Sequence, residues 1–257
     1  MFFRFFSADM KRVFRDYKLY IIIIIIAAVF SVAESYGERF FSEWIKFISL
    51  NARLVMVAVA TSAAVYSYGL GEDMEYGYYK QLLLRGNPIA YIVSKTISAF
   101  LAGAFAMAGG FGVACVYKFL TMQHIVEDVD YDAGGLYVKL FFERRFIAYF
   151  LAVMLHYAVF AGIVALIGML ISLYIENRLI TYTAPIALIM ILNIFLQRFL
   201  GVDIGASLSI YALGAYSITS PVGFMSIPVY YTEILIWFVT LVAWIYMKFR
   251  RKVCYGE

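Results

Sequence analysis

Three polar side chains that lie in long apolar stretches could carry chemistry inside a membrane. They are His156, Asn193 and Glu233. A polar group at membrane depth costs free energy, so each is a candidate for proton transfer or ligand binding. His156 could relay a proton, and Glu233 could meet a cationic substrate. The structural alternatives, which we favour, are a hydrogen bond of His156 within a helix bundle and pairing of Glu233 with a neighbouring segment.

An acidic run has a spacing that could bind calcium. Residues 127–134 read EDVDYDAG, with aspartates at alternate positions before a glycine. An EF-hand loop requires Gly at its sixth position and Glu at its twelfth. Those positions hold Ala133 and Lys139 in this sequence. We therefore expect a solvated acidic loop and no metal site.

The sequence lacks the common motifs of enzymes. It has no G-x-x-x-x-G-K-[ST] phosphate loop, no H-E-x-x-H zinc motif and no G-x-S-x-G nucleophile motif. Residues 205–209 (GASLS) come nearest to the last motif but lack its final glycine. We predict that the chain has no catalytic residue, does not hydrolyse ATP itself and binds no cofactor.

The elements that must position these residues are six long apolar stretches separated by short charged links. They run near Leu19–Ala33, Ala52–Leu70, Ile89–Tyr117, Phe146–Ile175, Leu179–Leu200 and Val229–Met247. A membrane-spanning helix needs about 20 apolar residues, and a soluble core does not explain 64% hydrophobic residues in this arrangement. The sequence therefore predicts one domain, residues 1–257, that is an all-α membrane protein with six transmembrane helices.

The distribution of Lys and Arg predicts the orientation of these helices. If the N-terminus is inside and the sides alternate, the inside carries 13 basic and 7 acidic residues, and the outside carries 8 and 10. Basic residues are retained on the cytoplasmic side, and the tail 248–252 (KFRRK) is the strongest indication. We expect a multi-pass protein of the cell membrane with both termini in the cytoplasm.

Three further segments are expected at the membrane surfaces. Residues 1–18 combine apolar and basic residues at helical spacing, which predicts an interfacial helix with its basic residues near anionic headgroups. Residues 118–145 are expected to form an outer loop. Residues 204–228 are expected to enter the outer leaflet and return, because counting them as a crossing would place the basic tail outside.

The third stretch has two features that concern packing and charge. Small residues recur on it at four-residue spacing, which lets helix backbones approach closely. They are Ala102, Ala106, Gly110 and Ala114. Lys95 enters the same stretch from the inside, and we expect its long side chain to extend to the interface.

The link between the second and third stretches carries the most specific motif. Residues 71–88 read GEDMEYGYYKQLLLRGNP. The order and approximate spacing of its residues resemble the permease subunits of type-2 ABC exporters. The residues that carry the resemblance are Glu75, Gly77, Leu82–Leu84, Pro88 and Lys95.

The resemblance implies an architecture and a mechanism. In that family six spans have both ends inside, an amphipathic helix precedes the first span and a hairpin re-enters the membrane between the last two spans. A separate ATPase subunit binds the ATP, and two permeases form one pathway. The implied substrate is hydrophobic or amphipathic (a peptide, a lipid or a drug) and moves outward. Chain length and aromatic content also resemble permeases of antimicrobial-peptide export or immunity, whereas the long loop 118–145 departs from the family.

The charges of residues 71–88 suit the docking of an ATPase. The coupling residues that we expect are Glu72, Asp73, Glu75, Gly77, Lys80 and Arg85. The expected partners are an ABC ATPase subunit, a second copy or a sister permease, and the lipid bilayer; no nucleic-acid partner is expected. The alternatives are a secondary transporter or channel and a stand-alone membrane immunity protein.

Overall fold

The computed structural model describes residues 2–32, 41, 44, 52–80, 87–122, 137, 139–140, 143–200 and 227–255. These residues are mostly helical and contain no β-strand. Three of their helices are long and apolar enough to cross a membrane. They are α7 (Pro88–Thr121), α9 (Phe146–Ser172) and the segment Tyr230–Val253 of α13 (Ile227–Tyr255). The prediction of an all-α architecture is confirmed, and the three apolar helices support a place in the membrane.

Other apolar helices belong to the same bundle. They are α2 (Tyr17–Val32), α4 (Ala52–Ala63) and α10 (Arg178–Leu200). Residues 204–226 and most of residues 118–145 lie outside the described part of the chain. The re-entrant segment, the outer loop and the count of six spans therefore stay predictions.

The second predicted stretch, Ala52–Leu70, does not continue as one helix. α4 ends at Ala63, a turn follows over residues 64–68, and α5 (Gly69–Glu75) begins after it. In this turn two backbone amides bond to carbonyls three residues back, a pattern that tightens the end of a helix. α5 is thus a separate short helix at one end of the bundle.

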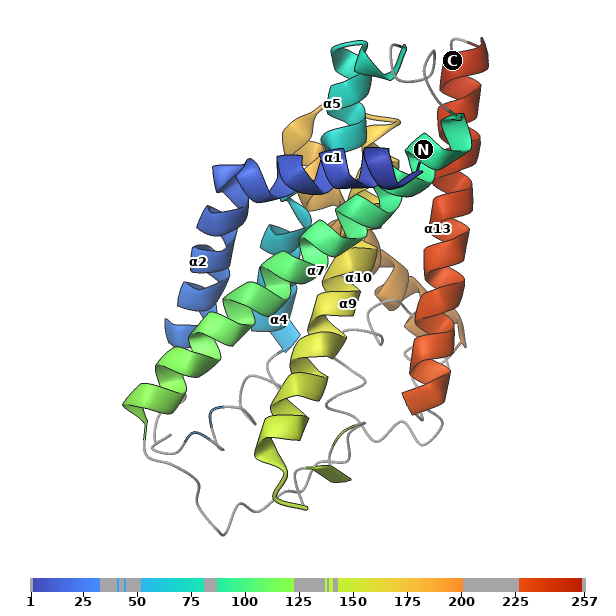
Figure 1. Cartoon of the computed structure of the whole chain (residues 1–257). Helices are drawn as coiled ribbons and strands as arrows, with labels where there is room; N and C mark the ends of the chain where they lie inside the picture. The colour runs from blue at the N-terminus through green and yellow to red at the C-terminus, as the bar shows by residue number, and fades with distance from the viewer. Residues whose placement is uncertain are drawn as a thin grey trace.

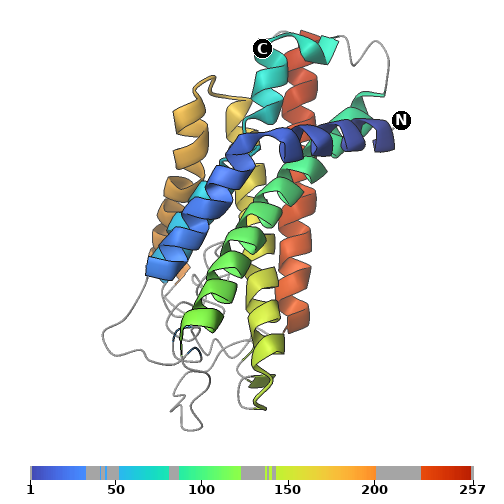
Figure 2. The same ribbon diagram turned by 60° about the vertical axis from the view of Figure 1, so that its left-hand side comes forward.

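Helices α7 and α9 form the centre of the bundle (Figure 1). α1 (Phe2–Arg15) and α2 pack on α7, α4 and α10 pack on α9, and α13 contacts both central helices. The two ends of the described chain lie at the end of the bundle that carries α5 (Figures 1 and 2). We call this the α5 end.

Small residues let α2 pack closely against α7. The stripe expected from the sequence is buried throughout and consists of Ala102, Ala106, Gly110 and Ala114. A Cβ on Gly110 would lie 2.5 Å from the Cβ of Ile26 and 3.1 Å from the carbonyl oxygen of Ile23. α2 therefore rests on bare backbone of α7, and the prediction of close packing at this stripe is confirmed.

α1 lies across the α5 end and meets α2 at a sharp corner (Figure 2). The sequence predicts one helix over residues 1–18, whereas the structure divides it at Asp16. The Asp16 carboxylate accepts a hydrogen bond from the amide of Lys18 at 3.0 Å, which is how an aspartate satisfies the first amides of a new helix. The corner lets α1 lie on the bundle while α2 runs along it.

Substituting Gly110 by Ala should destabilise the protein, whereas Gly112→Ala on the same helix should not. Alanine stabilises a helix relative to glycine by about 1 kcal/mol, but the clash with Ile26 would cost about 1–3 kcal/mol. A Cβ at Gly112 meets only the sulfur of Met154, at 3.9 Å. Unfolding titrations in mixed micelles measure both variants, and equal stabilities would contradict the close packing of α2 on α7.

Candidate functional site

A buried lysine organises the α5 end of the bundle. Lys95 lies two turns into α7, whose first turn is set by Asn87 as the N-cap and by Pro88. The Asn87 side chain accepts a hydrogen bond from the amide of Ile89 at 2.9 Å, and proline suits the first helical position because the N–H it lacks would be unpaired there. The Lys95 side chain is 2% exposed. Its ammonium group is therefore enclosed by protein and does not end in water.

Two carboxylates from other helices share the Lys95 ammonium group. Its Nζ lies 2.8 Å from Oδ1 of Asp9 in α1 and 2.7 Å from Oδ2 of Asp73 in α5. It also donates to the hydroxyl of Tyr66 at 2.8 Å. An ammonium group has three donors and no acceptor, so these contacts satisfy it. Lys95 thereby joins α1, α5, α7 and the turn that precedes α5.

The two carboxylates have further partners of their own. Asp9 accepts hydrogen bonds from the Tyr66 hydroxyl at 3.0 Å and, at 3.3 Å, from a serine hydroxyl of α7. Asp73 accepts from the Tyr91 hydroxyl at 2.8 Å and from Arg12 at 3.0 Å. A buried charge costs a great deal of free energy unless it is paired and hydrogen-bonded. These partners supply what the burial of both carboxylates requires.

More exposed charges surround this buried centre. Arg12 donates to Oε2 of Glu72 at 2.9 Å. Arg178, at the start of α10, lies 3.6 Å from Glu72 and 3.6 Å from Glu75, and its guanidinium group lies 5.3 Å from the centroid of the Tyr68 ring. α10 is therefore attached to α5 as well. We use the name charge network for the set Asp9, Arg12, Tyr66, Glu72, Asp73, Glu75, Tyr91, Lys95 and Arg178.

Burial and charge act in opposite directions at Asp73. Burial alone would raise the pKa of this carboxyl group, but the charge of Lys95 and hydrogen bonds from Lys95 and Tyr91 outweigh it and hold the pKa below its ordinary value. At Arg12, partial burial acts to lower the pKa, but the hydrogen bond to Asp73 and the charges of Asp73 and Glu72 together outweigh it, so the pKa is raised. Both groups are therefore charged at neutral pH.

The charge network specifies a geometry more than it adds stability. Two charges taken out of water regain their hydration energy only when their geometry is good and their remaining atoms are hydrogen-bonded. Removal of one partner leaves an uncompensated buried charge, at a cost of about 3–5 kcal/mol. The low-energy state of the α5 end is therefore the one in which α1, α5 and α7 meet at Lys95.

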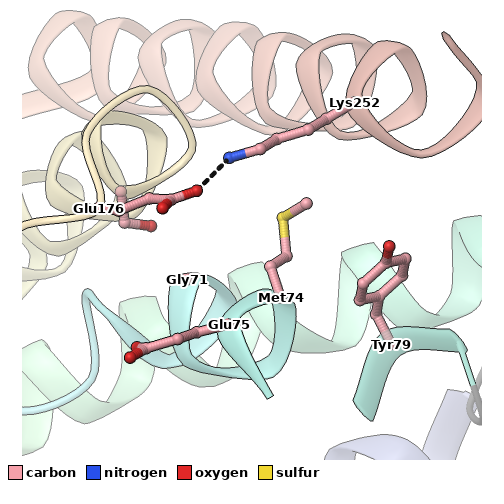
Figure 3. Close-up of a pocket in the computed structure, with 7 residues that line it drawn as sticks. Gly71, Met74, Glu75, Tyr79, Glu176 and Lys252 are labelled. Carbon is pink, nitrogen blue, oxygen red and sulfur yellow. Dashed lines mark hydrogen bonds and ion pairs between the residues drawn. The ribbon is translucent and has the colours of Figure 1, made fainter. Parts of the chain in front are cut away.

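A pocket of about 240 Å³ lies beside α5 at the same end of the bundle (Figure 3). Met74 and Tyr79 line one side, and Glu176 and Lys252 line the other. Lys252 lies 3.4 Å from Oε1 of Glu176. The side chain of Glu75 is 50% exposed and that of Glu176 is 82% exposed. The rim of this pocket therefore presents two carboxylates to solvent.

The predicted coupling residues have different environments. Asp73 is buried and paired within the protein, Glu72 is partly exposed, and Glu75 and Lys80 are exposed. Arg85 lies outside the described residues. The structure thus brings Glu72, Asp73 and Glu75 into one network. Of these three side chains, Glu75 is exposed to solvent, Glu72 is partly exposed and Asp73 is not.

Gly77 has a conformational reason to be glycine. Its φ angle is 69°, in the left-handed region that side chains with a Cβ disfavour. Its amide bonds to the carbonyl of Met74 at 3.1 Å, which satisfies one of the last carbonyls of α5. The glycine of the motif therefore ends α5 and redirects the chain.

Of the intramembrane candidates with described side chains, neither His156 nor Glu233 joins the charge network. His156 is fully buried in α9. Its Nδ1 lies 3.3 Å from the Tyr137 hydroxyl, and its ring stacks on Tyr230 with centroids 4.1 Å apart. Glu233 in α13 is partly buried, and the side chain of Asn193 lies outside the described part. The surroundings of His156 agree with the structural alternative, in which it is bonded inside the bundle.

The sequence analysis did not identify Asp9, Tyr66 and Tyr91 as site residues. A signal for Asp9 existed, because it is the only acidic residue between Phe2 and Arg15. An isolated acidic residue on an otherwise basic and apolar helix needs a cationic partner when it is turned inward. The tyrosines gave no such signal, since the chain has 22 of them.

No protein-family model, no curated protein and no solved structure matches this chain. Its function is therefore inferred from the geometry of the α5 end and from the motif of residues 71–88. Both concern the same elements, because the motif begins within α5 and ends where α7 begins.

Lys95→Met should cost about 3–5 kcal/mol of unfolding free energy, because it leaves two buried carboxylates without their cation. Lys252→Met is the matched control. Its partner Glu176 is largely exposed, and an exposed pair contributes about 0–1 kcal/mol. Mixed-micelle unfolding titrations measure both variants. Similar losses in the two variants would contradict the central place of Lys95 in the charge network.

Proposed function

We propose that this chain is the membrane subunit of an ATP-driven exporter of the type-2 ABC kind, powered by a separate ATPase subunit. One observation carries the proposal. α5 is a short helix at one end of the bundle, and the buried carboxylate of Asp73 ties it to α7 through the buried Lys95 and to α1 through the partly exposed Arg12. A force applied to α5 from outside the membrane would therefore move transmembrane helices. A link that served only to connect two spans would not need a buried lysine between two carboxylates.

The charge network connects α5 to α1, α7 and α10. Asp73 bonds Lys95 of α7, Arg12 of α1 bonds both Glu72 and Asp73, and Arg178 brings in α10. Hydrogen bonds and ion pairs are electrostatically stronger in the low-dielectric interior than in water. α7 has 34 residues, or about 50 Å at the rise of an α-helix, so a displacement at Lys95 would be carried through the depth of a bilayer.

The surface that would receive the ATPase lies around the exposed part of α5. Glu75 and Glu176 line the rim of the pocket in Figure 3, and Tyr76 and Tyr78 are 60% and 52% exposed. Tyrosines are enriched at protein interfaces. We infer that these side chains contact the ATPase, whereas Asp73 transmits its movement inside the permease.

The remaining parts of the proposal concern topology and partners. Both ends of the described chain lie at the α5 end (Figure 1), which supports six spans with both termini in the cytoplasm. Residues 204–228 would form the re-entrant outer hairpin, and a second copy or a sister permease would complete the pathway. The ATP would be bound by the partner ATPase, and the substrate would be a hydrophobic or amphipathic peptide, lipid or drug.

A secondary transporter is less well supported by the positions of the polar groups. Such a protein needs ion-coupling groups near the middle of the membrane. The charge network lies at the end of the bundle instead. His156 lies within α9, away from the charge network, and its ring is packed against Tyr137 and Tyr230. We therefore retain the exporter as the proposal.

Reversing the charges of the two exposed carboxylates at the pocket, Glu75 and Glu176, should prevent the ATPase subunit from binding to the chain. Glu75→Lys combined with Glu176→Lys is expected to abolish the ATP hydrolysis that co-purifies with the tagged chain from its native membranes, because both carboxylates face the proposed contact. Asp73 is left unchanged, since its reversal would disrupt the charge network itself. Phosphate release by the purified material is the measurement.

Glu143→Lys is the control for this experiment. Glu143 precedes α9 at the end of the bundle opposite α5, and its side chain is 39% exposed. This variant should keep full ATP hydrolysis. If the double variant at the pocket keeps it as well, the docking surface is assigned incorrectly; if the wild-type chain carries no ATPase, the exporter proposal fails.

A cysteine placed at Lys80 should report the side of the membrane on which α5 lies. Lys80 is exposed, and the native Cys115 is buried. In a background with Cys254→Ser, a membrane-impermeant maleimide should label Lys80→Cys in inverted vesicles but not in intact cells. Labelling in intact cells would place α5 outside and would remove it from the reach of any ATPase.

A further inference from the structure

The outward surface of α1 consists of two adjoining stripes. The apolar stripe is formed by Phe3, Phe6, Met10 and Phe14, and the basic stripe by Arg4, Lys11 and Arg15. Members of each stripe recur within one or two helical turns, so both stripes run along the helix. A surface hollow of about 630 Å³ lies where the stripes meet. Its lining includes side chains from both stripes and the hydroxyl-bearing Ser7.

The apolar stripe faces the same region as the lipid-exposed side of α7. The ring of Phe14 lies 5.8 Å from the ring of Phe105, and Phe105, in the middle of α7, is 46% exposed. α7 is one of the three helices that could cross a membrane. A helix with this arrangement lies in the interface with its apolar face towards the acyl chains. The basic stripe then lies at the level of the headgroups.

The exposed charges of α1 all have the same sign. Asp9 is its only acidic residue, and this carboxylate is buried against Lys95. Lys11 and Arg15 also line a second hollow, of about 600 Å³, together with Arg12, Ala8 and Asp16, so that three basic residues face one acidic residue there. Charge complementarity therefore favours an anion beside Lys11 and Arg15, and the adjoining apolar stripe favours acyl chains. A phospholipid with an anionic headgroup combines the two.

We infer that α1 binds an anionic phospholipid, with the phosphate at Lys11 and Arg15 and an acyl chain along Phe6, Met10 and Phe14, and that this lipid stabilises the charge network. The occupant is a membrane lipid and not a soluble anion, because the apolar stripe is continuous with the basic one. The inference rests on the membrane placement in the proposed function but not on the ATPase, so the two can fail separately.

The link between lipid and network is the helix itself. α1 carries Asp9 and Arg12 into the charge network on its other side. A ligand that binds only the docked position of α1 stabilises that position by its binding free energy, and two sites on one element are coupled reciprocally. Anionic lipid under α1 would thus hold Asp73, and with it α5, in the arrangement described above.

Hydrogen exchange of the purified full chain in nanodiscs tests this inference. Replacing part of the phosphatidylcholine by phosphatidylglycerol should slow amide exchange in both α1 and α5. The expected slowing is up to about thirtyfold, since each of two basic residues near an anionic surface contributes a factor of about five. Lys11→Gln combined with Arg15→Gln should lose this response while exchanging like the wild type in phosphatidylcholine alone.

Arg250→Gln combined with Arg251→Gln is the matched control. These residues are exposed at the same end of the bundle but lie on α13, so this variant should keep the full response. The assignment of the lipid site to Lys11 and Arg15 is overturned if phosphatidylglycerol still slows exchange in the α1 variant. It is also overturned if the control variant loses the slowing to the same extent. Slower exchange in α1 without slower exchange in α5 overturns the link to the charge network. The same slowing by soluble glycerol phosphate in phosphatidylcholine discs overturns the assignment to a lipid.

Discussion

The burial of one ammonium group constrains the whole α5 end of this protein. Lys95 is 2% exposed within a bundle of apolar helices, and a charge in such a place needs opposite charges and a complete set of hydrogen bonds. Its own helix does not supply the carboxylates. They come from residues separated from Lys95 by 86 and 22 positions, Asp9 and Asp73. The N-terminal helix and α5 must therefore both be in place before this end of the bundle reaches its low-energy state.

The backbone geometry shows how the chain meets this requirement. Gly110 lets α2 rest on the backbone of α7, which places the start of α2 beside the first half of α7. The corner at Asp16 then turns the chain, so that α1 crosses α7 (Figure 1) and brings Asp9 to Lys95. A straight continuation of α2 would carry Asp9 away from the bundle. The packing of α2 on α7 and the corner at Asp16 together thus place α1 where Asp9 can pair with Lys95.

Local sequence features predicted the helices well and the charge pairing poorly. The apolar stretches are recognised by their length and composition, and the small-residue stripe around Gly110 and the amphipathic N-terminal helix by their helical spacing, so one segment at a time is enough to recognise them. Glu72, Asp73 and Glu75 share one short acidic run, and nothing local distinguishes the member that is buried. The burial of Lys95 was not predicted for the same reason: a lone lysine can extend to the interface, but this one has partners on two other helices.

In the proposed mechanism, the balance of charge separates the residues that would transmit movement from those that would receive a partner. The buried centre contains Asp9, Asp73 and Lys95, and the half-exposed guanidinium group of Arg12 at its edge completes two charges of each sign, a balance that makes the burial tolerable. The outer part contains Glu72, Glu75 and Arg178 and has an excess negative charge. An excess charge is stable only where water or a cationic partner reaches it. The part of the network that can gain from a basic partner is therefore the part on the surface of α5, and a partner that binds there acts on the buried centre through Glu72 and Arg12.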